Sequence, residues 1–287
     1  MSAKAFLVNP RVSVISGTEC IRGIATTEYH VYIVRYGSNH IEVYDKDNIA
    51  VRRQNIDVPE MSDAYSMTAC QHYNCLYISD SSAQIHRLQL SNRSVTKWSL
   101  KDISWGLSVT SNHNLLVSLY NTKIIQEYTT QGSLVREINP GISTHGLIHS
   151  IEMSTGQIVV CHWRRPQLRV LTVDTSGKVI TSYDGPSGSA AGQLVDPHCL
   201  TLDSQNNVLV ADYNHSKVVL FSPTLNHLGD ITLSQHQLSR PYRLQFDQLR
   251  GRLYIGEESG LVFVLERASE SKWWKYIPWI STRRKSD

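Results

Sequence analysis

The sequence has no long hydrophobic run, no cysteines in a CxxC spacing and no segment with the pattern of a long amphipathic helix. Its apolar runs fall well short of the roughly 20 residues that a membrane-spanning helix needs. The first residues contain only a short apolar run, 5–8, which is too short for the apolar core of a signal peptide. We therefore expect a cytoplasmic protein with no membrane partner.

The five cysteines are an odd number, so neither a disulfide framework nor a structural zinc site is indicated. We expect them to be reduced thiols buried in strands. The phosphate-binding pattern GxxxxGK[ST] and the nucleophile pattern G-x-S-x-G are both absent. A net charge of +3 neither demands nor excludes a nucleic-acid partner.

What the sequence does contain is a repeat. Six times, an apolar run is followed by a short polar turn and a second apolar run, at spacings of roughly 40–50 residues, the period of propeller blades. The six copies begin at Tyr32, Leu76, Leu116, Val159, Leu209 and Leu253. Valine, isoleucine, leucine and tyrosine fill the runs, while glycine, asparagine, serine and aspartate fill the gaps, which is strand and turn chemistry.

Each copy has a short apolar run before it and another after it, so each unit has four strands. The pattern predicts an all-β, six-bladed β-propeller with four-stranded antiparallel blades around a central channel. We expect one domain over residues 1–280 and a basic tail over residues 281–287. Closing the ring requires a terminal strand, for which the two candidates are Ala5–Val8 and Trp273–Ile277.

One unit carries a family resemblance. Residues 192–203 read GQLVDPHCLTLD and residues 207–221 read NVLVADYNHSKVVLF. They resemble the NHL repeat, whose V-A-D step is followed by an asparagine, and the other copies are degenerate but in register. The resemblance implies an NHL-type propeller. Such propellers often end tripartite-motif ubiquitin ligases, where they bind RNA or protein, but no RING, B-box or coiled-coil segment is present here.

The acid of the V-A-D step recurs as Asp80, Asp212 and Glu257. An acid at a strand end can accept hydrogen bonds from backbone N–H groups of the adjoining turn. We expect these three to serve that structural purpose.

In this fold, the residues just before the innermost strands gather at one mouth of the channel. By alignment they are Arg22, Tyr65, Trp105, either His145 or Leu147, His198 and Tyr242, with Arg243 next to the last. Aromatic and arginine side chains are typical of binding hot spots, although they could equally cap the hub. We expect a non-catalytic binding module without a cofactor, either a monomer or part of a larger complex.

The expected partner is a protein or peptide, and RNA is possible. Phosphate contacts could come from Arg22, Arg52, Arg53 and the turn 163–166, which reads WRRP.

The alternative is a metal-dependent lyase or hydrolase. Pro197-His198-Cys199-Leu200 resembles a step of the peptidyl-hydroxyglycine amidating lyases, which are propellers that hold zinc through three histidines. The resemblance implies metal ligands, for zinc or calcium, at His198 and His145. The third matching histidine is missing, and His149 or His162 would have to take its place. The catalytic candidates under this reading are His198, His149, Asp212 and Glu257.

Overall fold

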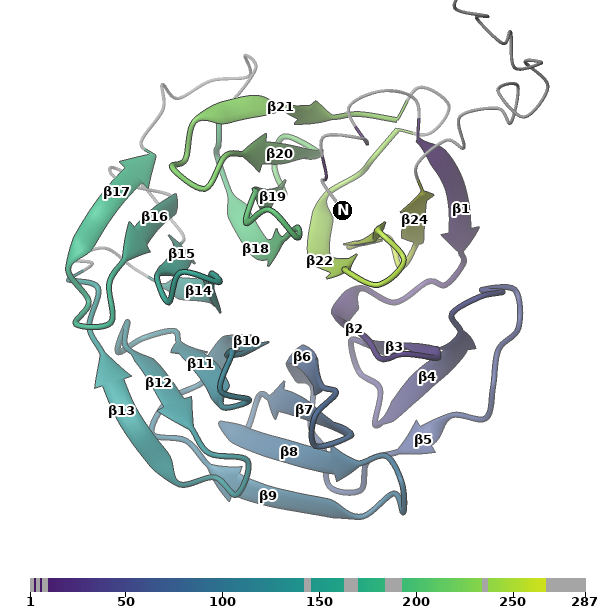
Figure 1. The fold of residues 1–287 in the computed structure, drawn as a ribbon. Helices are drawn as coiled ribbons and strands as arrows, with labels where there is room; N and C mark the ends of the chain where they lie inside the picture. The colour runs from purple at the N-terminus through teal and green to yellow at the C-terminus, as the bar shows by residue number, and fades with distance from the viewer. Residues whose placement is uncertain are drawn as a thin grey trace, which may run out of the picture.

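The computed structural model describes residues 3, 6, 10–141, 146–162, 170–183, 193–233 and 237–266. In this part of the chain, six four-stranded antiparallel sheets surround a common axis and form a closed ring (Figure 1). The protein is thus a six-bladed β-propeller, as the repeat predicts. The described residues contain no helix that is long and apolar enough to cross a membrane.

Each blade runs from an innermost strand at the axis to an outermost strand at the perimeter. The innermost strands are β2 (Ile21–Thr26), β6 (Ala64–Cys70), β10 (Ser104–Val109), β14 (Leu147–Glu152), β18 (Pro197–Leu202) and β22 (Pro241–Asp247). The second strands are β3 (His30–Arg35), β7 (Cys75–Asp80), β11 (Leu115–Leu119), β15 (Ile158–His162), β19 (Val208–Asp212) and β23 (Arg252–Glu257). The third strands are β4 (His40–Asp45), β8 (Gln84–Gln89), β12 (Ile125–Tyr128), β16 (Val170–Val173), β20 (Lys217–Phe221) and β24 (Val262–Glu266). The outermost strands are β5 (Ile56–Asp57), β9 (Val95–Ser99), β13 (Leu134–Ile138), β17 (Val179–Tyr183), β21 (His227–Ile231) and β1 (Arg11–Ile15).

The core lies between neighbouring blades. The second strands β7, β11 and β19 are buried along their whole length, whereas β13 and β17 at the perimeter are largely exposed. Apolar clusters join adjacent blades, for example Tyr77 of one blade with Leu107 of the next. Since a sheet buried on both faces needs apolar residues on both, the runs at these strands are nearly continuous rather than alternating.

Among the described residues, the ring is closed by β1. β1 pairs antiparallel with β24, from Arg11 opposite Glu266 to Ile15 opposite Val262, and becomes the outermost strand of blade six. The prediction of Ala5–Val8 was wrong, because the pairing residues lie six positions further along. Phe6 instead packs edge-on against Phe246, with ring centroids 6.2 Å apart. Trp273–Ile277 and the tail 281–287 lie outside the described residues.

Every innermost strand has a β-bulge near its first residue. At each bulge one residue is skipped in the pairing with the second strand, which bends the strand and redirects that side chain. We call these six the bulge residues: Arg22, Tyr65, Trp105, Ile148, His198 and Tyr242. Five of them are those expected from the alignment. In blade four the position belongs to Ile148, while Leu147 pairs with His162 and His145 lies outside the described residues.

Candidate binding face and central channel

The guanidinium of Arg243 lies at the centre of the ring of bulge residues. Its Nε donates to the carbonyl oxygen of Arg22 at 2.7 Å. Its other N–H groups donate to further main-chain carbonyls, all of bulge residues: those of Tyr65, Trp105, His198 and Tyr242. One side chain from blade six therefore connects the backbones of five blades.

The donors of a guanidinium lie in one plane, and their acceptors surround the channel. The plane of Arg243 consequently lies across the channel rather than along it. Arg243 is only 5% exposed and forms no ion pair with a carboxylate of the described residues. The ring of carbonyl oxygens, which could otherwise attract a cation, is thus already occupied by a cation of the protein itself.

One side of Arg243 is lined by aromatic rings. Trp105 stacks on Tyr120 with centroids 4.9 Å apart, and Tyr65 lies against Trp105 at 5.6 Å. Tyr120 directly follows β11, so it belongs to the turn at the same end of the blade as the bulges. Blades two and three thereby contribute a continuous aromatic surface.

Across the mouth, blades five, six and one form a second group. The ring of His198 lies between those of Tyr213 and Tyr242, at 4.7 and 4.8 Å. Arg22 donates to the Tyr242 hydroxyl at 2.5 Å, and its guanidinium lies 4.8 Å from the ring of Tyr36. We call the two groups together the mouth face: Arg22, Tyr36, Tyr65, Trp105, Tyr120, His198, Tyr213 and Tyr242.

An exposed ion pair lies beside the mouth face. Arg240 Nη1 is 2.8 Å from Glu258 Oε2, and the Arg240 guanidinium lies 5.5 Å from the ring of Tyr213. Burial of the Tyr213 hydroxyl and its hydrogen bond to Glu258 raise the pKa of Tyr213 to about 12. This tyrosine therefore remains a neutral hydrogen-bonding group at physiological pH.

The acids of the V-A-D step hold turns, as their position at strand ends predicts. Asp212 accepts hydrogen bonds from the backbone N–H groups of Val195 and Asp196. Asp80 likewise accepts from turn N–H groups, including that of Gln84 at 3.1 Å, and Glu257 accepts from Ser239.

In blade three Leu119 occupies the acid's position, and the turn is held from the other side. Asp102, in the preceding loop, accepts from the N–H groups of Asn121 and Thr122. These bonds, together with the Asn121 side chain, outweigh desolvation and hold the pKa of Asp102 below its ordinary value.

Of the histidines in the metal hypothesis, His145 lies outside the described residues. His149 uses both ring nitrogens: Nε2 donates to the Leu107 carbonyl at 3.1 Å, and Nδ1 accepts from the Leu200 N–H at 3.3 Å. Burial, aided by the charge of Arg243, lowers the pKa of His149 to about 4. Within the described ranges, no group of three or more histidine, cysteine, aspartate or glutamate side chains is placed to hold a metal ion.

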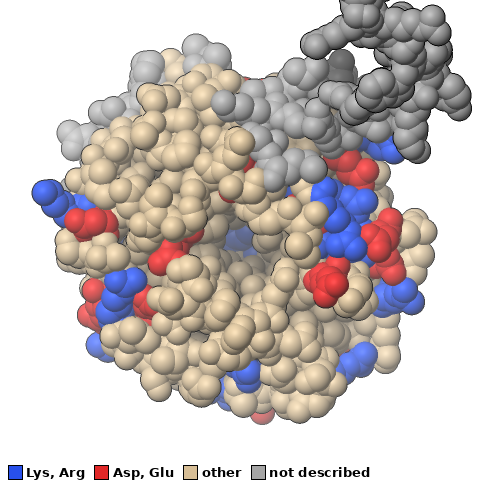
Figure 2. Space-filling model, viewed as in Figure 1, with Lys and Arg blue, Asp and Glu red and all other residues tan. Residues whose placement is uncertain are grey.

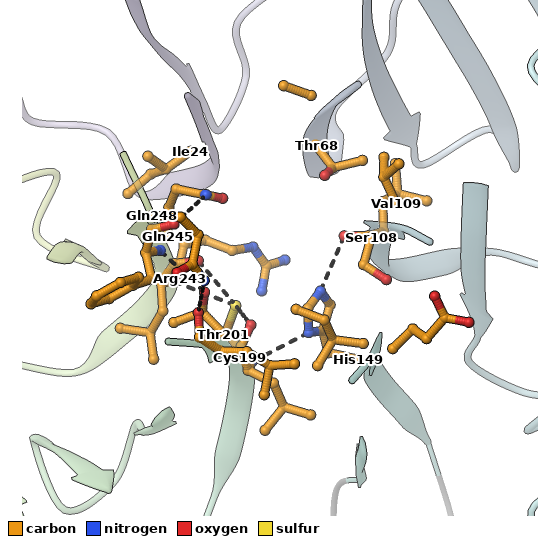
Figure 3. A pocket seen from close by; sticks show the side chains of 18 of the residues that line it. Ile24, Thr68, Ser108, Val109, His149, Cys199, Thr201, Arg243, Gln245 and Gln248 are labelled. Atoms are coloured by element: carbon orange, nitrogen blue, oxygen red, sulfur yellow. Dashed lines mark hydrogen bonds between the residues drawn. The ribbon is translucent and has the colours of Figure 1, made fainter. Parts of the chain in front are cut away.

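On the other side of Arg243 the channel widens into a cavity of about 390 Å³ (Figure 3). Small polar side chains such as Thr68, Ser108 and Thr201 line it, with His149 and Arg243 at its inner end. Figure 2 shows a central hollow with basic atoms at its depth and mostly uncharged surface around it. Arg243 is the single lysine or arginine among the lining residues. The repeat pattern did not reveal this cavity, because its residues are ordinary strand residues in the sequence.

Of the arginines expected to contact phosphate, Arg22 belongs to the mouth face, whereas Arg52 and Arg53 do not. Arg52 and Arg53 belong to the segment between β4 and β5, where they pair with Glu42 and Asp45 at 3.0 and 2.8 Å. The turn 163–166 lies outside the described residues.

Comparison with known proteins agrees with this architecture. The profile of the NHL repeat matches residues 194–221, which comprise most of blade five. The chain is a six-bladed β-propeller that contains an NHL repeat. No curated protein sequence matches it significantly.

Solved structures with a similar fold are propellers of different kinds. Virginiamycin B lyase from Staphylococcus aureus has a TM-score of 0.66 at 12% identity, covering 89% of this chain and 99% of the lyase. The WD40 β-propeller domain of Doa1 has a TM-score of 0.63 at 13% identity, covering 90% and 96%. An auxiliary nutrient binding protein from Bacteroides thetaiotaomicron has a TM-score of 0.68 at 12% identity, covering 87% and 69%. At such identities the likeness concerns the fold alone.

Proposed function

We propose that this NHL-containing propeller is a non-catalytic binding module whose mouth face receives a protein or peptide. The observation that carries the proposal is the set of aromatic and arginine side chains that five of the six bulges gather around one opening. Tyrosine, tryptophan and arginine are the residues in which interface energy concentrates. Here they are held by a rigid scaffold, so little conformational entropy is lost when a partner binds.

Part of the mouth face is open to a partner, although His198 and Tyr242 are only 5% exposed. The Tyr36 side chain is 48% exposed, and Trp105 is partly exposed although it stacks on Tyr120. A partner side chain could therefore contact both aromatic groups without unfolding either. The exposed Arg240–Glu258 pair offers one charge of each sign at the edge of the same surface.

The charges favour a protein over RNA. Nucleic-acid binding needs several unpaired cations that follow a phosphate chain. Near the mouth face, Arg240 is paired with Glu258, and Arg22 is stacked between Tyr36 and Tyr242. Arg52 and Arg53 are paired elsewhere.

The experiment uses a peptide selected from a random library on the immobilised wild-type protein. We expect Tyr36→Ala with Trp105→Ala to weaken its binding at least roughly 30-fold, as hot-spot truncations do. The matched control is Tyr73→Ala, since Tyr73 is a similarly exposed tyrosine, 37% exposed, in the β6–β7 turn at the other end of its blade. Circular dichroism confirms that both variants are folded.

Two outcomes contradict the proposal. In one, the double variant retains full affinity while Tyr73→Ala loses it. In the other, a random RNA pool binds the wild type better than any peptide, with an affinity that falls steeply as salt is raised.

The metal-dependent lyase or hydrolase remains a separate prediction. Its support is the resemblance around His198 and a fold shared with a lyase at 12% identity. Metal analysis of the purified protein tests it: a stoichiometric zinc or calcium that disappears in His198→Ala would replace the binding proposal with the enzymatic one.

A further inference from the structure

Two cysteines face each other at the end of one hairpin. In the register of β6 and β7, Cys70 is directly opposite Cys75, and the four residues 71–74 form the turn between them. Both side chains are buried in the same apolar cluster between blades two and three. They are therefore neighbours by strand pairing, independently of how the rest of the ring is arranged.

The pairing satisfies the geometric requirement of a disulfide. Residues directly opposite in an antiparallel pair have Cα atoms roughly 4.5–5.5 Å apart, and disulfides usually join Cα atoms roughly 4.4–6.8 Å apart. Because directly opposite side chains also point to the same face of the sheet, the two sulfur atoms could be joined without moving the strands.

The two thiols have different acidities. The hydrogen bond from the Cys75 thiol, supported by the turn N–H groups of Tyr73 and His72, lowers the pKa of Cys70 despite its burial. That same hydrogen bond, together with burial, raises the pKa of Cys75. In contrast, burial raises the pKa of the other three thiols, which belong to Cys20, Cys161 and Cys199.

The turn gives the pair a route to solvent. Gln71, His72, Tyr73 and Asn74 are all exposed, although the sulfurs beneath them are covered. Opening this hairpin end exposes Cys70 without separating the blades, and such local openings cost less than global unfolding. Cys161, on the interior strand β15, is fully buried, whereas Cys199 lines the central cavity but has Ala211, not a cysteine, opposite it in its blade.

We propose that Cys70 and Cys75 are a redox modification site, which a low-molecular-weight disulfide such as glutathione disulfide oxidises reversibly to an intrablade disulfide. The Cys70 thiolate attacks one sulfur of the reagent, forms a mixed disulfide and releases one thiolate. Cys75 has then lost its hydrogen-bond acceptor and gives its proton to the released thiolate. Its sulfur attacks Sγ of Cys70 and displaces the second thiolate, which takes a proton from water. Two protein thiols are oxidised, and one reagent disulfide is reduced to two thiols.

The test uses the folded full-length chain and glutathione disulfide. Trypsin leaves both cysteines, and no other, in the single peptide 54–87. After oxidation and alkylation of the remaining thiols, we expect this peptide to be two hydrogens lighter and unalkylated, and to return to two alkylated cysteines after reduction. Cys161 and Cys199 in the same sample stay alkylatable after unfolding and serve as internal controls.

Single variants assign the roles of the two thiols. Cys75→Ser should accumulate glutathione on Cys70, because the resolving thiol is missing, whereas Cys70→Ser should accumulate little on Cys75. The proposal is overturned if the folded wild type keeps both thiols free under conditions in which its unfolded chain forms the disulfide. It is also overturned if Cys161 or Cys199 is oxidised first. Neither result bears on the mouth face.

Discussion

The two sides of Arg243 are built from the same six strands but from different kinds of residue. On the mouth side each blade contributes one bulge residue, and most of these are aromatic or basic. On the cavity side, residues further along those strands include small polar ones, such as Ser66, Ser108 and Thr201, beside apolar ones such as Leu107 and Leu200. A bulge that redirects one side chain per strand is enough to give a symmetric scaffold two unlike ends.

Two arginines show what this difference means energetically. Arg243 is buried and hydrogen-bonded to backbone carbonyls of five blades, so its contacts help to hold the blades together. Arg22 lies between two tyrosine rings and reaches a single hydroxyl, so it belongs to the surface. We therefore expect substitutions of Arg243 to lower the free energy of unfolding. Substitutions in the mouth face should mainly weaken binding of the partner.

The largest expected effect comes from Arg243→Met, which keeps the length of the side chain but removes its five donors. The carbonyl oxygens of the bulge residues would lose their partner in a buried ring, at a cost of about 4 kcal/mol in the free energy of unfolding. Urea denaturation measures it. Arg240→Met, at an exposed ion pair, should change stability by no more than about 0.5 kcal/mol. Similar losses in both variants would contradict the distinction.

The next effect is a pH dependence. The pKa of His149 is about 4 in the folded protein, against an ordinary value of 6.5, so as pH falls the unfolded chain takes up the proton first. Stability should be complete above about pH 6.5 and should decrease by roughly 3 kcal/mol as pH falls to about 4. In His149→Gln, which can still donate and accept, denaturation curves over this range should show a smaller decrease. If stability decreases with falling pH as much in His149→Gln as in the wild type, then groups other than His149 cause the pH dependence.

Gly106 gives a test of the contact between blades three and four. A Cβ there would lie 2.4 Å from the Ile148 carbonyl oxygen and 2.5 Å from Cδ2 of His149. Because a backbone atom cannot easily move aside, we expect Gly106→Ala to cost about 2 kcal/mol. Gly156→Ala is the matched control, as its φ is +80° but nothing lies within 4 Å; it should cost about 1 kcal/mol from backbone strain alone. Thermal denaturation measures the loss of stability in Gly106→Ala and in Gly156→Ala, and the loss should be larger in Gly106→Ala.

A smaller stability effect than those of Arg243→Met, His149 protonation and Gly106→Ala is expected at the mouth face itself. Arg22→Met removes two cation–π contacts and one hydrogen bond to Tyr242, worth about 1 kcal/mol together at a partly exposed site. The same variant should weaken binding of the selected peptide more than Arg243→Lys does. If Arg22→Met lowers the free energy of unfolding as much as Arg243→Met does, then Arg22 also helps to hold the blades together.

The repeat in the sequence predicted the blades because hydrophobic runs and turn residues are local signals. The outermost strand Leu134–Ile138 was placed correctly in this way. The strand that closes the ring was missed, although Arg11–Ile15 resembles Leu134–Ile138 in having only its last residue buried. Its partner β24 lies near the other end of the sequence, so no neighbouring turn or hairpin in the sequence identifies the pairing.

The candidate site was predicted in part for the same reason. Five bulge residues follow from the register of the repeat, but blade four was misaligned, because the segment before it contains both His145 and Leu147 near the expected position. The structure places Ile148 there. Whether these residues bind a partner remains a prediction that the peptide experiment tests.

The sequence by itself determined the six blades and the acids that hold their turns, because strand periodicity and turn chemistry act between residues close in the chain. Only the tertiary structure decided that Arg243 lies across the channel, that His149 is neutral and that a cavity opens behind them. These features depend on backbone groups more than 40 residues away, such as the Leu107 carbonyl that accepts from His149. A carbonyl oxygen is present at every residue, so its position in space leaves no mark in the amino-acid sequence.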